Sequence, residues 1–513
     1  MPFVSANTPV IVGASQFTER IDDPDYATLS PVAITARAAE LALMDAGMDG
    51  CKEHIDTVMT TRIFEDSAPV LEFPFGRSNN FPRSVCKRLN INPAMAIWAT
   101  SGGDTPQKLV TEACDRIWQG VSKAVLISGG EALSTSRFLQ KQGSDVDWSE
   151  DLEEQVDDRG AIIDYLTHDE IMNGLVTPPL FYGLMENAKR LAAGIDADRW
   201  AEQMGALFAP FAAVASENPL AAQHDKAFTA ADLTTVAPGN RYVASPYPQR
   251  LVARDQVNQS AALVVISTGL ADALGISPSA RVYLHGQAVA GEPPVTLRAE
   301  LGQAPSAGLA LNRALDRAAC VADDIAYFDF YSCFPIAVSN AIEAIDLSGD
   351  DPRGLTITGG LPYFGGPGNS YSMHALAEMM VRLRSHPEKR GLVGANGGFL
   401  SKYAVGIYAT TPAAYEPYDS SDLDEAMSQQ VVPHFETNPN GEGKIEAYTL
   451  AYDREGQVKT AIIAGRLLQD DARFLAKAGR DAPDVLKRFG NSHLGEQSVL
   501  VTAGEQGNSF SFL

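Results

Sequence analysis

The segment GGPGNSYSMHAL, residues 365–376, joins a glycine-rich turn to the start of an apolar helical pattern. Asn369, Tyr371 and His374 lie at this junction. Asparagine donates and accepts hydrogen bonds, tyrosine can donate a proton, and histidine exchanges one near neutral pH. Glycines let a ligand approach the backbone closely, and a helix N-terminus favours negative charge. The segment therefore predicts a site for a phosphate, an oxyanion or an acid–base reaction.

Two further glycine turns, TSGGDTPQ (100–107) and GANGGFLS (394–401), and the short segment YSC (331–333) also follow apolar, strand-like runs. In open α/β sheets, ligands bind at such strand ends. Backbone amides in these turns can stabilise an oxyanion without any side chain. The candidate catalytic residues are Tyr331, Cys333, Tyr371 and His374, the candidate oxyanion-binding residues are Gly103, Asn369, Asn396 and Gly397, and Ser401 and Lys402 are further candidates.

Each candidate also has a purely structural interpretation. A lone histidine on an apolar helix face, such as His374, is typical of a hydrogen-bonded core residue, and a lone cysteine such as Cys333 is typical of core packing. Tyr331 and Tyr371 can bury their rings and bind backbone groups through their hydroxyls. Asn369 can equally cap the helix that begins near residue 370. The sequence leaves both interpretations open.

The elements that must position these residues occur twice along the chain. VIVGASQF (10–17) and RVYLHGQAV (281–289) share a strand-like apolar run followed by a glycine and, shortly after it, a glutamine, and helical patterns follow at 33–48 and 308–321. The offset of about 270 residues lies far beyond the periods of solenoid repeats. Strand-like runs that alternate with helical patterns indicate strands covered by helices on both faces. We therefore expect two copies of one α/β domain.

The composition changes twice. Residues 135–245 begin with an acidic, polar stretch and continue as long helical patterns, which indicates a helical insertion over the sheet ends. Residues 444–452 and 458–468 read as two strands joined by a turn near Gly456, within a β-rich region typical of a small barrel. The predicted domains are 1–134 together with 246–276, 135–245, 277–418 and 419–513.

Charge and composition exclude several functions. A net charge of −24 argues against binding to nucleic acid or to an anionic membrane, and an anionic ligand needs a local basic pocket. No apolar run approaches the roughly 18 residues of a membrane span, and the N-terminus lacks the pattern of a signal peptide, so we expect a cytoplasmic protein. Five scattered cysteines and the absence of HxxxH and HExxH pairs predict no metal site.

Two α/β halves, three glycine turns at strand ends and a helical insertion together resemble the thiolase superfamily over about residues 8–412. GVSKAVLISGGEALS (120–134) resembles the thiolase segment that ends in GG-x-E-S-M-S, and GGLPYFGGPGNS (359–370) is similar to the turn that carries the family's Gly-His-Pro. YSCF (331–334) is similar to the family's Asn-Glu-Ala-Phe or His-Asp-Cys-Phe. The β-rich C-terminal region makes the chain most similar to the thiolase-like proteins of type 1.

The resemblance implies a five-layer α-β-α-β-α core with a helical loop domain, here followed by an OB-like C-terminal barrel. It also implies that the usual catalytic residues are missing. Gly103 stands at the position of the nucleophilic cysteine, Gly366 at that of the activating histidine, and Ala395 at that of the second cysteine. Removing residues that share proton transfer and nucleophilic attack lowers rates by orders of magnitude.

The resemblance therefore implies a protein of an acyltransferase family that binds CoA or an acyl-CoA as a substrate or ligand, without a covalently bound cofactor. We expect no Cys/His/Cys thiolysis. The protein is expected either to act on another acyl or carbon–carbon bond next to a carbonyl, or to be a catalytically silent binding or scaffold protein. A Rossmann-type dinucleotide site is disfavoured because no turn matches G-x-G-x-x-G followed by an acidic residue. A monomer and a homodimer both remain open.

Overall fold

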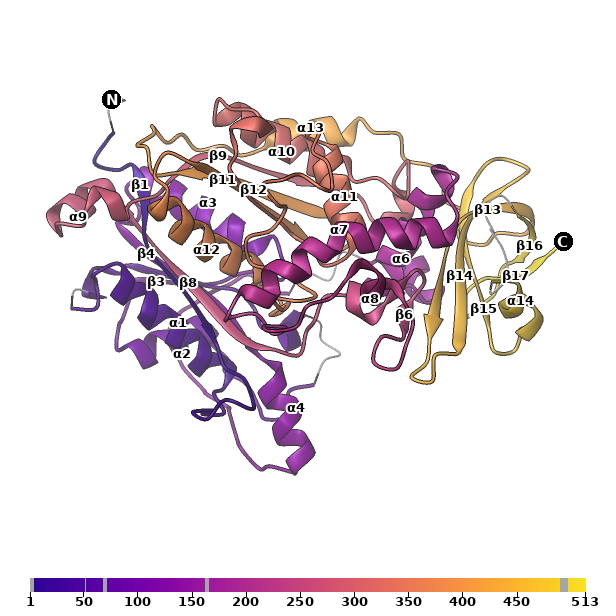
Figure 1. Cartoon of the computed structure of the whole chain (residues 1–513), viewed down its shortest axis with the longest axis horizontal. Coiled ribbons are helices and arrows are strands. Elements are labelled where there is room, and N and C mark those ends of the chain that lie inside the picture. The colour runs from indigo at the N-terminus through magenta and orange to yellow at the C-terminus, as the bar shows by residue number, and fades with distance from the viewer. Residues whose placement is uncertain (1–3, 51, 68–71, 162–165, 490–496) are drawn as a thin grey trace.

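The structure is a computed structural model of the 513-residue chain, and it describes residues 4–50, 52–67, 72–161, 166–489 and 497–513. Two mixed β-sheets and the helices around them fill one side of the molecule in Figure 1, and a β-barrel lies at the other end of its long axis. Three helices of the insertion, α6 (Pro178–Ala192), α7 (Ala197–Glu217) and α8 (Ala230–Thr234), lie between these two parts. Within the described ranges, no helix has both the length and the apolar character that a membrane span requires.

The N-terminal sheet has the strand order β1-β8-β4-β2-β3-β5. β8 is antiparallel to β1 and β4, whereas β2 is parallel to β3 and β4. Every residue of β4 and β8 is buried, because helices cover both faces of the sheet. The strands are β1 (Pro9–Thr18), β2 (Thr57–Thr60), β3 (Met95–Trp98), β4 (Ala124–Ala132), β5 (Asp157–Asp158) and β8 (Asn258–Ser267).

The second sheet repeats this order as β10-β11-β12-β9, which corresponds to β2-β4-β8-β1 of the first. β12 is antiparallel to both of its neighbours, as β8 is. The repeat that the sequence predicts is therefore present in the topology. The strands are β9 (Tyr283–Gly291), β10 (Tyr327–Phe330), β11 (Arg390–Gly397) and β12 (Lys402–Ala409).

Helices complete the five layers that the thiolase resemblance implies. α3 (Thr105–Trp118) and α12 (Tyr371–Ser385) lie between the two sheets and contact strands of both (Figure 1). α1 (Pro31–Asp45) and α2 (Phe81–Leu89) cover the outer face of the N-terminal sheet. α10 (Pro305–Arg317) covers the second sheet, and α11 (Pro335–Glu343) packs on α10. Proline is tolerated in the first turn of α1, α3, α10 and α11, where an amide hydrogen has no intrahelical partner.

The predicted insertion is largely helical, but short strands within it pair with other parts of the molecule. β6 (Tyr242–Ala244) pairs with a strand of the barrel and with β7 (Tyr247–Pro248), and β5 extends the N-terminal sheet. The insertion is therefore joined by backbone hydrogen bonds to both of its neighbours. Its helices are α4 (Leu133–Gln142), α5 (His168–Met172), α6 (Pro178–Ala192), α7 (Ala197–Glu217) and α8 (Ala230–Thr234), and α9 (Thr268–Ala273) follows β8.

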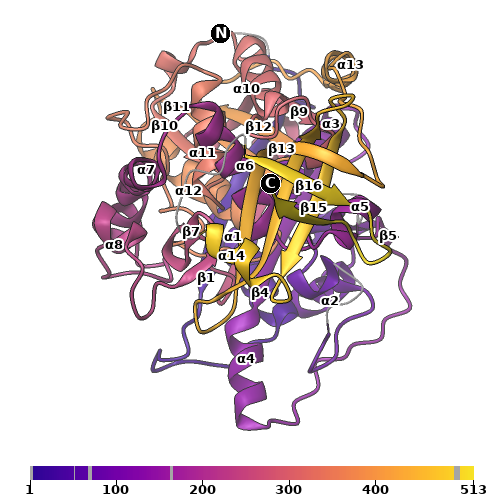
Figure 2. The same ribbon diagram turned by 90° about the vertical axis from the view of Figure 1, so that its right-hand side faces the viewer.

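The C-terminal region forms the predicted barrel, which faces the viewer in Figure 2. Its five strands run in the order β14-β15-β17-β16-β13, and the pairing of β13 with β14 closes it. The predicted hairpin is confirmed, and its turn contains Gly456 with a φ of +79°. The elements are α13 (Ser421–Ser428), β13 (Gly441–Tyr452), β14 (Val458–Leu467), β15 (Arg473–Gly479), α14 (Pro483–Phe489), β16 (Ser498–Thr502) and β17 (Ser509–Phe512).

One buried arginine attaches the barrel to the core. Arg473 is completely buried and donates hydrogen bonds to the carbonyl oxygens of Thr296, Arg298 and Ala299. Its guanidinium also pairs with Glu446 at 2.7 Å. Since a buried guanidinium is stable only when its donors are satisfied, these bonds fix the barrel on the 292–304 segment.

Candidate functional site

Tyr331 occupies the space in front of Gly103. Tyr331 follows β10, and its amide donates to the carbonyl oxygen of Gly394 at 2.9 Å, which sets it beside the end of β11. A Cβ atom built on Gly103 would overlap the hydroxyl and ring of Tyr331 and would lie 2.5 Å from the carbonyl oxygen of Asn396. The position of the expected nucleophile therefore has no room for a side chain.

Asp104, the next residue along the chain, is a site residue that the sequence did not reveal. It is 1% exposed, and within the described ranges neither carboxylate oxygen has a hydrogen-bond partner. The Nζ atom of Lys108 lies 3.7 Å from Oδ2. A Cβ atom on Gly102 or Gly397 would overlap the carboxylate. An aspartate just before a helix is usually interpreted as an N-cap, so the sequence gives no sign that Asp104 has a functional role.

Cys333 lies in a buried polar cluster with Tyr182 of α6, Asn396, Tyr331 and Tyr403. The Asn396 amide nitrogen donates to the Tyr182 hydroxyl at 2.8 Å and to the Cys333 sulfur at 3.5 Å. Burial raises the pKa of Cys333 to about 12. Burial, together with Cys333 and Asp104 nearby, raises the pKa of Tyr331 well above its usual value. Both groups are therefore protonated at neutral pH.

The hydroxyl of Tyr371 is engaged elsewhere, although its ring packs edge-to-face on that of Tyr331, with centroids 5.5 Å apart. The hydroxyl donates to Asp329 Oδ1 at 3.0 Å and lies 2.7 Å from the Thr358 hydroxyl. The Ile357 amide donates to Oδ2 of Asp329 at 3.0 Å. Burial raises the pKa of Asp329 despite these bonds. The Tyr371 hydroxyl thus satisfies a buried carboxyl group.

The start of α12 is bonded to the turn before α3. The Gly102 amide donates to the side-chain oxygen of Asn369 at 2.9 Å, and the Ser372 hydroxyl donates to the carbonyl oxygen of Gly103 at 2.6 Å. The Asn369 side chain also donates to the carbonyl oxygen of Arg62 at 3.0 Å. The N-cap of α12 is Ser370, which makes no side-chain capping bond. Asn369 therefore positions the 102–104 turn instead of capping α12.

His374 and Ser401 have partners outside the Tyr331–Cys333 cluster. His374 is completely buried, with Nδ1 3.0 Å from the side-chain oxygen of Gln16 and its ring 5.0 Å from that of Phe364. Burial lowers the pKa of His374 to about 3, so it is neutral at physiological pH. The Ser401 hydroxyl accepts from the buried Arg298 at 3.2 Å. Lys402, the first residue of β12, is half-buried.

The structure thus brings together Gly103, Asp104, Tyr331, Cys333, Asn396 and Gly397. Gly397 lies against the Asp104 carboxylate, which limits the use of its backbone amide in an oxyanion hole while that carboxylate is charged, and Gly103 lies against the Tyr331 hydroxyl. The amide of Gly366 donates to the carbonyl oxygen of Arg254 at 2.7 Å, so Gly366 is bonded to the 254 segment and not to this group of residues.

A basic pocket lies beside Arg254. It has a volume of about 620 Å³ and is lined by residues of the insertion, by residues of the following 249–256 segment, and by Pro362 and Tyr363. A second hollow of about 460 Å³ shares some of its lining. The charged residues of the larger, 620 Å³ pocket are four basic ones, Lys226, Arg241, Arg250 and Arg254, and one acidic one, Asp255. Asp255 is paired with Arg137 at 2.7 Å. The pocket is therefore strongly basic in an acidic chain.

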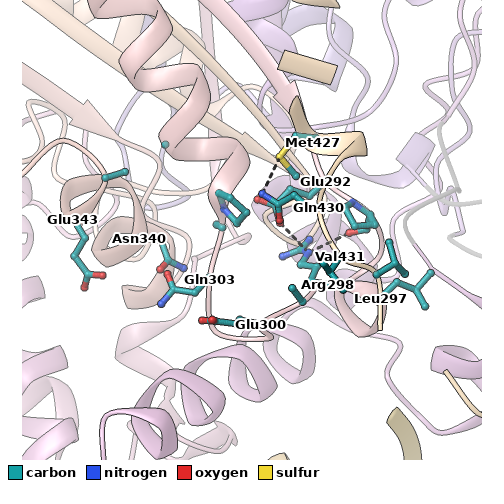
Figure 3. Close-up of a pocket in the computed structure, with 17 residues that line it drawn as sticks. Glu292, Leu297, Arg298, Glu300, Gln303, Asn340, Glu343, Met427, Gln430 and Val431 are labelled. Atoms are coloured by element: carbon teal, nitrogen blue, oxygen red, sulfur yellow. Dashed lines mark hydrogen bonds and ion pairs between the residues drawn. The ribbon is translucent and has the colours of Figure 1, made fainter. Parts of the chain in front are cut away.

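The pocket in Figure 3 has the opposite character. It measures about 440 Å³ and lies between the 292–305 segment, α11 and the residues after α13. Glu292, Glu300 and Glu343 supply carboxylates, and Arg298 is already paired with Glu292 at 3.2 Å. An acidic hollow of this kind repels phosphates, so it does not suit an anionic nucleotide.

Comparisons with known proteins agree with this architecture. The family model of the thiolase-like protein type 1 additional C-terminal domain matches residues 422–503. A crystal structure of a monomeric SCP2-thiolase like protein type 1 from Mycobacterium smegmatis is 38% identical over 100% of both chains, with a TM-score of 0.84. A comparison with curated protein sequences gave no match.

More distant structures share the fold. The dimeric peroxisomal thiolase of Saccharomyces cerevisiae is 12% identical, covers 79% of this chain and 98% of its own, and has a TM-score of 0.58. The Ltp2-ChsH2(DUF35) aldolase is 16% identical over 79% of this chain and 98% of its own, with a TM-score of 0.57. The full-length likeness at 38% identity, together with the matched C-terminal domain, shows that this chain belongs to the family of SCP2-thiolase like proteins of type 1.

Proposed function

We propose that the protein binds a CoA thioester and that the basic pocket holds its phosphate groups. The observation that carries this proposal is the gathering of four basic side chains around one pocket in a chain with a net charge of −24. CoA carries a diphosphate and a 3′-phosphate on its adenosine. Lysine and arginine are the side chains that bind phosphate best, and Arg can do so through two parallel hydrogen bonds.

The position of the pocket supports the same proposal. Val252, Ala253 and Arg254 form part of its wall. On the inner side, the Ala253 amide donates to the carbonyl oxygen of Cys333 at 3.1 Å. A single backbone segment therefore separates the pocket from the Tyr331–Cys333 cluster. A ligand whose phosphates lie in the pocket can direct a flexible arm toward this cluster, where the thioester would lie.

The side chains of this cluster support chemistry other than Cys/His/Cys thiolysis. Cys333, with its pKa raised to about 12, supplies almost no thiolate at neutral pH, and the thiolate is the nucleophilic form. The proposed function is therefore binding of an acyl-CoA, with any reaction confined to a bond next to the thioester carbonyl. Catalytically silent binding is the outcome if no such reaction occurs.

Isothermal titration calorimetry with CoA, 3′-dephospho-CoA and pantetheine tests the binding. We expect CoA to bind more tightly than pantetheine by about two orders of magnitude, since each charged hydrogen bond contributes about 1.5–3 kcal/mol. Lys226→Ala and Arg254→Ala, which remove exposed side chains of the pocket, should each weaken CoA binding about tenfold. Arg37→Ala, on the exposed face of α1, is the matched control. Equal affinity for CoA and pantetheine, unchanged in both pocket variants, would contradict the proposal.

We also propose that the chain is a monomer, as the Mycobacterium smegmatis protein is described to be. The outer edge of β3 is covered by β5, and the Arg159 amide donates to the carbonyl oxygen of Trp98 at 3.1 Å just beyond it. An exposed strand edge invites pairing with another chain, and this edge is occupied. Multi-angle light scattering should give a mass near 54.8 kDa, and a value twice as large would contradict the proposal.

A further inference from the structure

We propose that Asp104 is the group that accepts a proton from the carbon next to the thioester carbonyl, while Tyr331 donates a hydrogen bond to the enolate oxygen. The inference rests on the proposed binding of an acyl-CoA and adds a reaction and its base. It gives the protein an activity, exchange of the α-hydrogens of an acyl thioester, that binding alone does not require.

The first argument is the unsatisfied state of the Asp104 carboxylate. Buried polar groups are nearly always hydrogen-bonded, because an unpaired one costs about 1–3 kcal/mol and a charged one costs more. Asp104 is 1% exposed, and its oxygens have no hydrogen-bond partner in the described part of the chain. Lys108, 3.7 Å away and 38% exposed, supplies a nearby positive charge without a hydrogen bond. The carboxylate oxygens therefore have unused capacity to interact with a bound ligand.

The second argument is the shape of the backbone around the two side chains. Cβ atoms on Gly102 and Gly397 would overlap the Asp104 carboxylate, and one on Gly103 would overlap the Tyr331 hydroxyl. Gly102 also has a φ of +150°, which favours glycine. The absence of Cβ atoms at these three glycines thus leaves space for the Asp104 carboxylate and the Tyr331 hydroxyl beside the 102–104 turn. The N-terminus of α3 stabilises the negative charge of the carboxylate.

The third argument concerns the other groups in the cluster, which are proton donors. Burial raises the pKa of Tyr331, Tyr182 and Tyr403 above the usual value for tyrosine, and it raises that of Cys333 to about 12. All four are protonated at neutral pH. His374, which is neutral, is bonded to Gln16 outside the cluster. Among the described residues of the cluster, Asp104 is therefore the group suited to act as a base.

The proposed step is balanced without a cofactor. The C–H bond on the carbon next to the carbonyl breaks, and its proton moves to the Asp104 carboxylate. The electron pair of that bond forms the enolate, whose oxygen accepts a hydrogen bond from the Tyr331 hydroxyl. In the reverse direction, Asp104 returns a proton to the carbon. In D₂O the returned proton is a deuteron, so the acyl-CoA gains deuterium while its bonds are otherwise unchanged.

Deuterium incorporation into butanoyl-CoA in D₂O tests the inference. Mass spectrometry should show a gain of up to two deuterons on incubation with the wild-type protein, above the enzyme-free rate. Asp104→Asn keeps the shape and removes the base, so exchange should fall about 100-fold or more while butanoyl-CoA still binds in calorimetry. Tyr331→Phe should lower exchange about tenfold. Asp316→Asn, on the exposed face of α10, is the matched control.

The outcomes separate this inference from the proposed function. Binding without exchange in the wild-type protein overturns the role of Asp104 and leaves the binding proposal intact. Exchange that persists in Asp104→Asn overturns it as well. If the wild-type protein neither binds nor exchanges, both proposals are wrong. If Asp104→Asn does not fold, as judged by circular dichroism, unchanged exchange in a folded Tyr331→Phe variant contradicts the inference, and a tenfold loss with binding retained supports it.

Discussion

The hydroxyl of Tyr331 lies in the space where the side chain of residue 103 would begin, and only the absence of a Cβ atom at Gly103 allows this contact. The two residues are 228 positions apart in the sequence, and they meet because β10 of one half ends beside the turn before α3 of the other. A phenol therefore fills the space beside the residue that the thiolase resemblance matches to the nucleophile position.

Gly103→Cys should therefore not restore thiolysis. The new side chain would collide with Tyr331 and with the carbonyl oxygen of Asn396, 2.5 Å from the new Cβ atom, so we expect a loss of about 1–3 kcal/mol in the free energy of unfolding. Urea denaturation and an acetoacetyl-CoA thiolysis assay measure the two effects. Gly50→Cys, at an exposed glycine with open space around it, is the control. Restored thiolysis without loss of stability would contradict the predicted collision.

The Tyr371 hydroxyl should matter for stability. Tyr371→Phe leaves Asp329 Oδ1 without its donor, and an unsatisfied buried acceptor costs about 1–3 kcal/mol. Tyr363→Phe is a matched control, because the buried Tyr363 hydroxyl has no hydrogen-bond partner within the described ranges. We expect the control to change the unfolding free energy by less than about 0.5 kcal/mol. Equal effects of the two substitutions in urea denaturation would show that the bond to Asp329 contributes nothing.

His374 should make the stability of the protein depend on pH below 6.5. Its pKa is about 3 in the folded protein and near 6.5 in the unfolded chain, so the unfolded chain binds more protons between these values. The contribution to stability is complete above pH 6.5 and falls, by up to about 1.4 kcal/mol per pH unit, as the pH drops toward 3. Urea unfolding at pH 7 and pH 5 should show a smaller loss for His374→Gln than for the wild-type protein. His54→Gln, at an exposed position, should lose as much as the wild type.

Cys333 should react slowly with alkylating reagents. With a pKa of about 12, about one thiol in ten thousand is ionised at pH 8, against about a quarter for a free cysteine. Labelling with iodoacetamide, followed by peptide mapping, should leave Cys333 unmodified in the native protein and modify it after denaturation. The rate should rise about tenfold per pH unit while the fold persists. Rapid labelling of native Cys333 at pH 8 would contradict its predicted protonation.

Much of the fold could be read from the sequence because its signals are local. The repeated strand pattern at 10–17 and 281–289 became β1 and β9, and the two strand-like runs around Gly456 became β13 and β14. Both depend on the periodicity of apolar residues and on turn glycines over a few positions. The short strands β6 and β7, at the end of the insertion and just after it, were missed, since they are only two or three residues long and form by pairing with each other and with the barrel.

The sequence by itself determined the two α/β halves, the C-terminal barrel and the glycine turns at strand ends, because each follows from residue types at fixed spacing. That the Cys/His/Cys set is missing stays a prediction from the thiolase resemblance. Only the tertiary structure decided which polar groups meet. In the folded chain the Tyr371 hydroxyl donates to Asp329, and the Asp104 carboxylate has no hydrogen-bond partner among the described residues. Lys226 and Arg254 line the same pocket. The direction and desolvation of a side chain depend on segments hundreds of residues away, and no local pattern encodes those contacts.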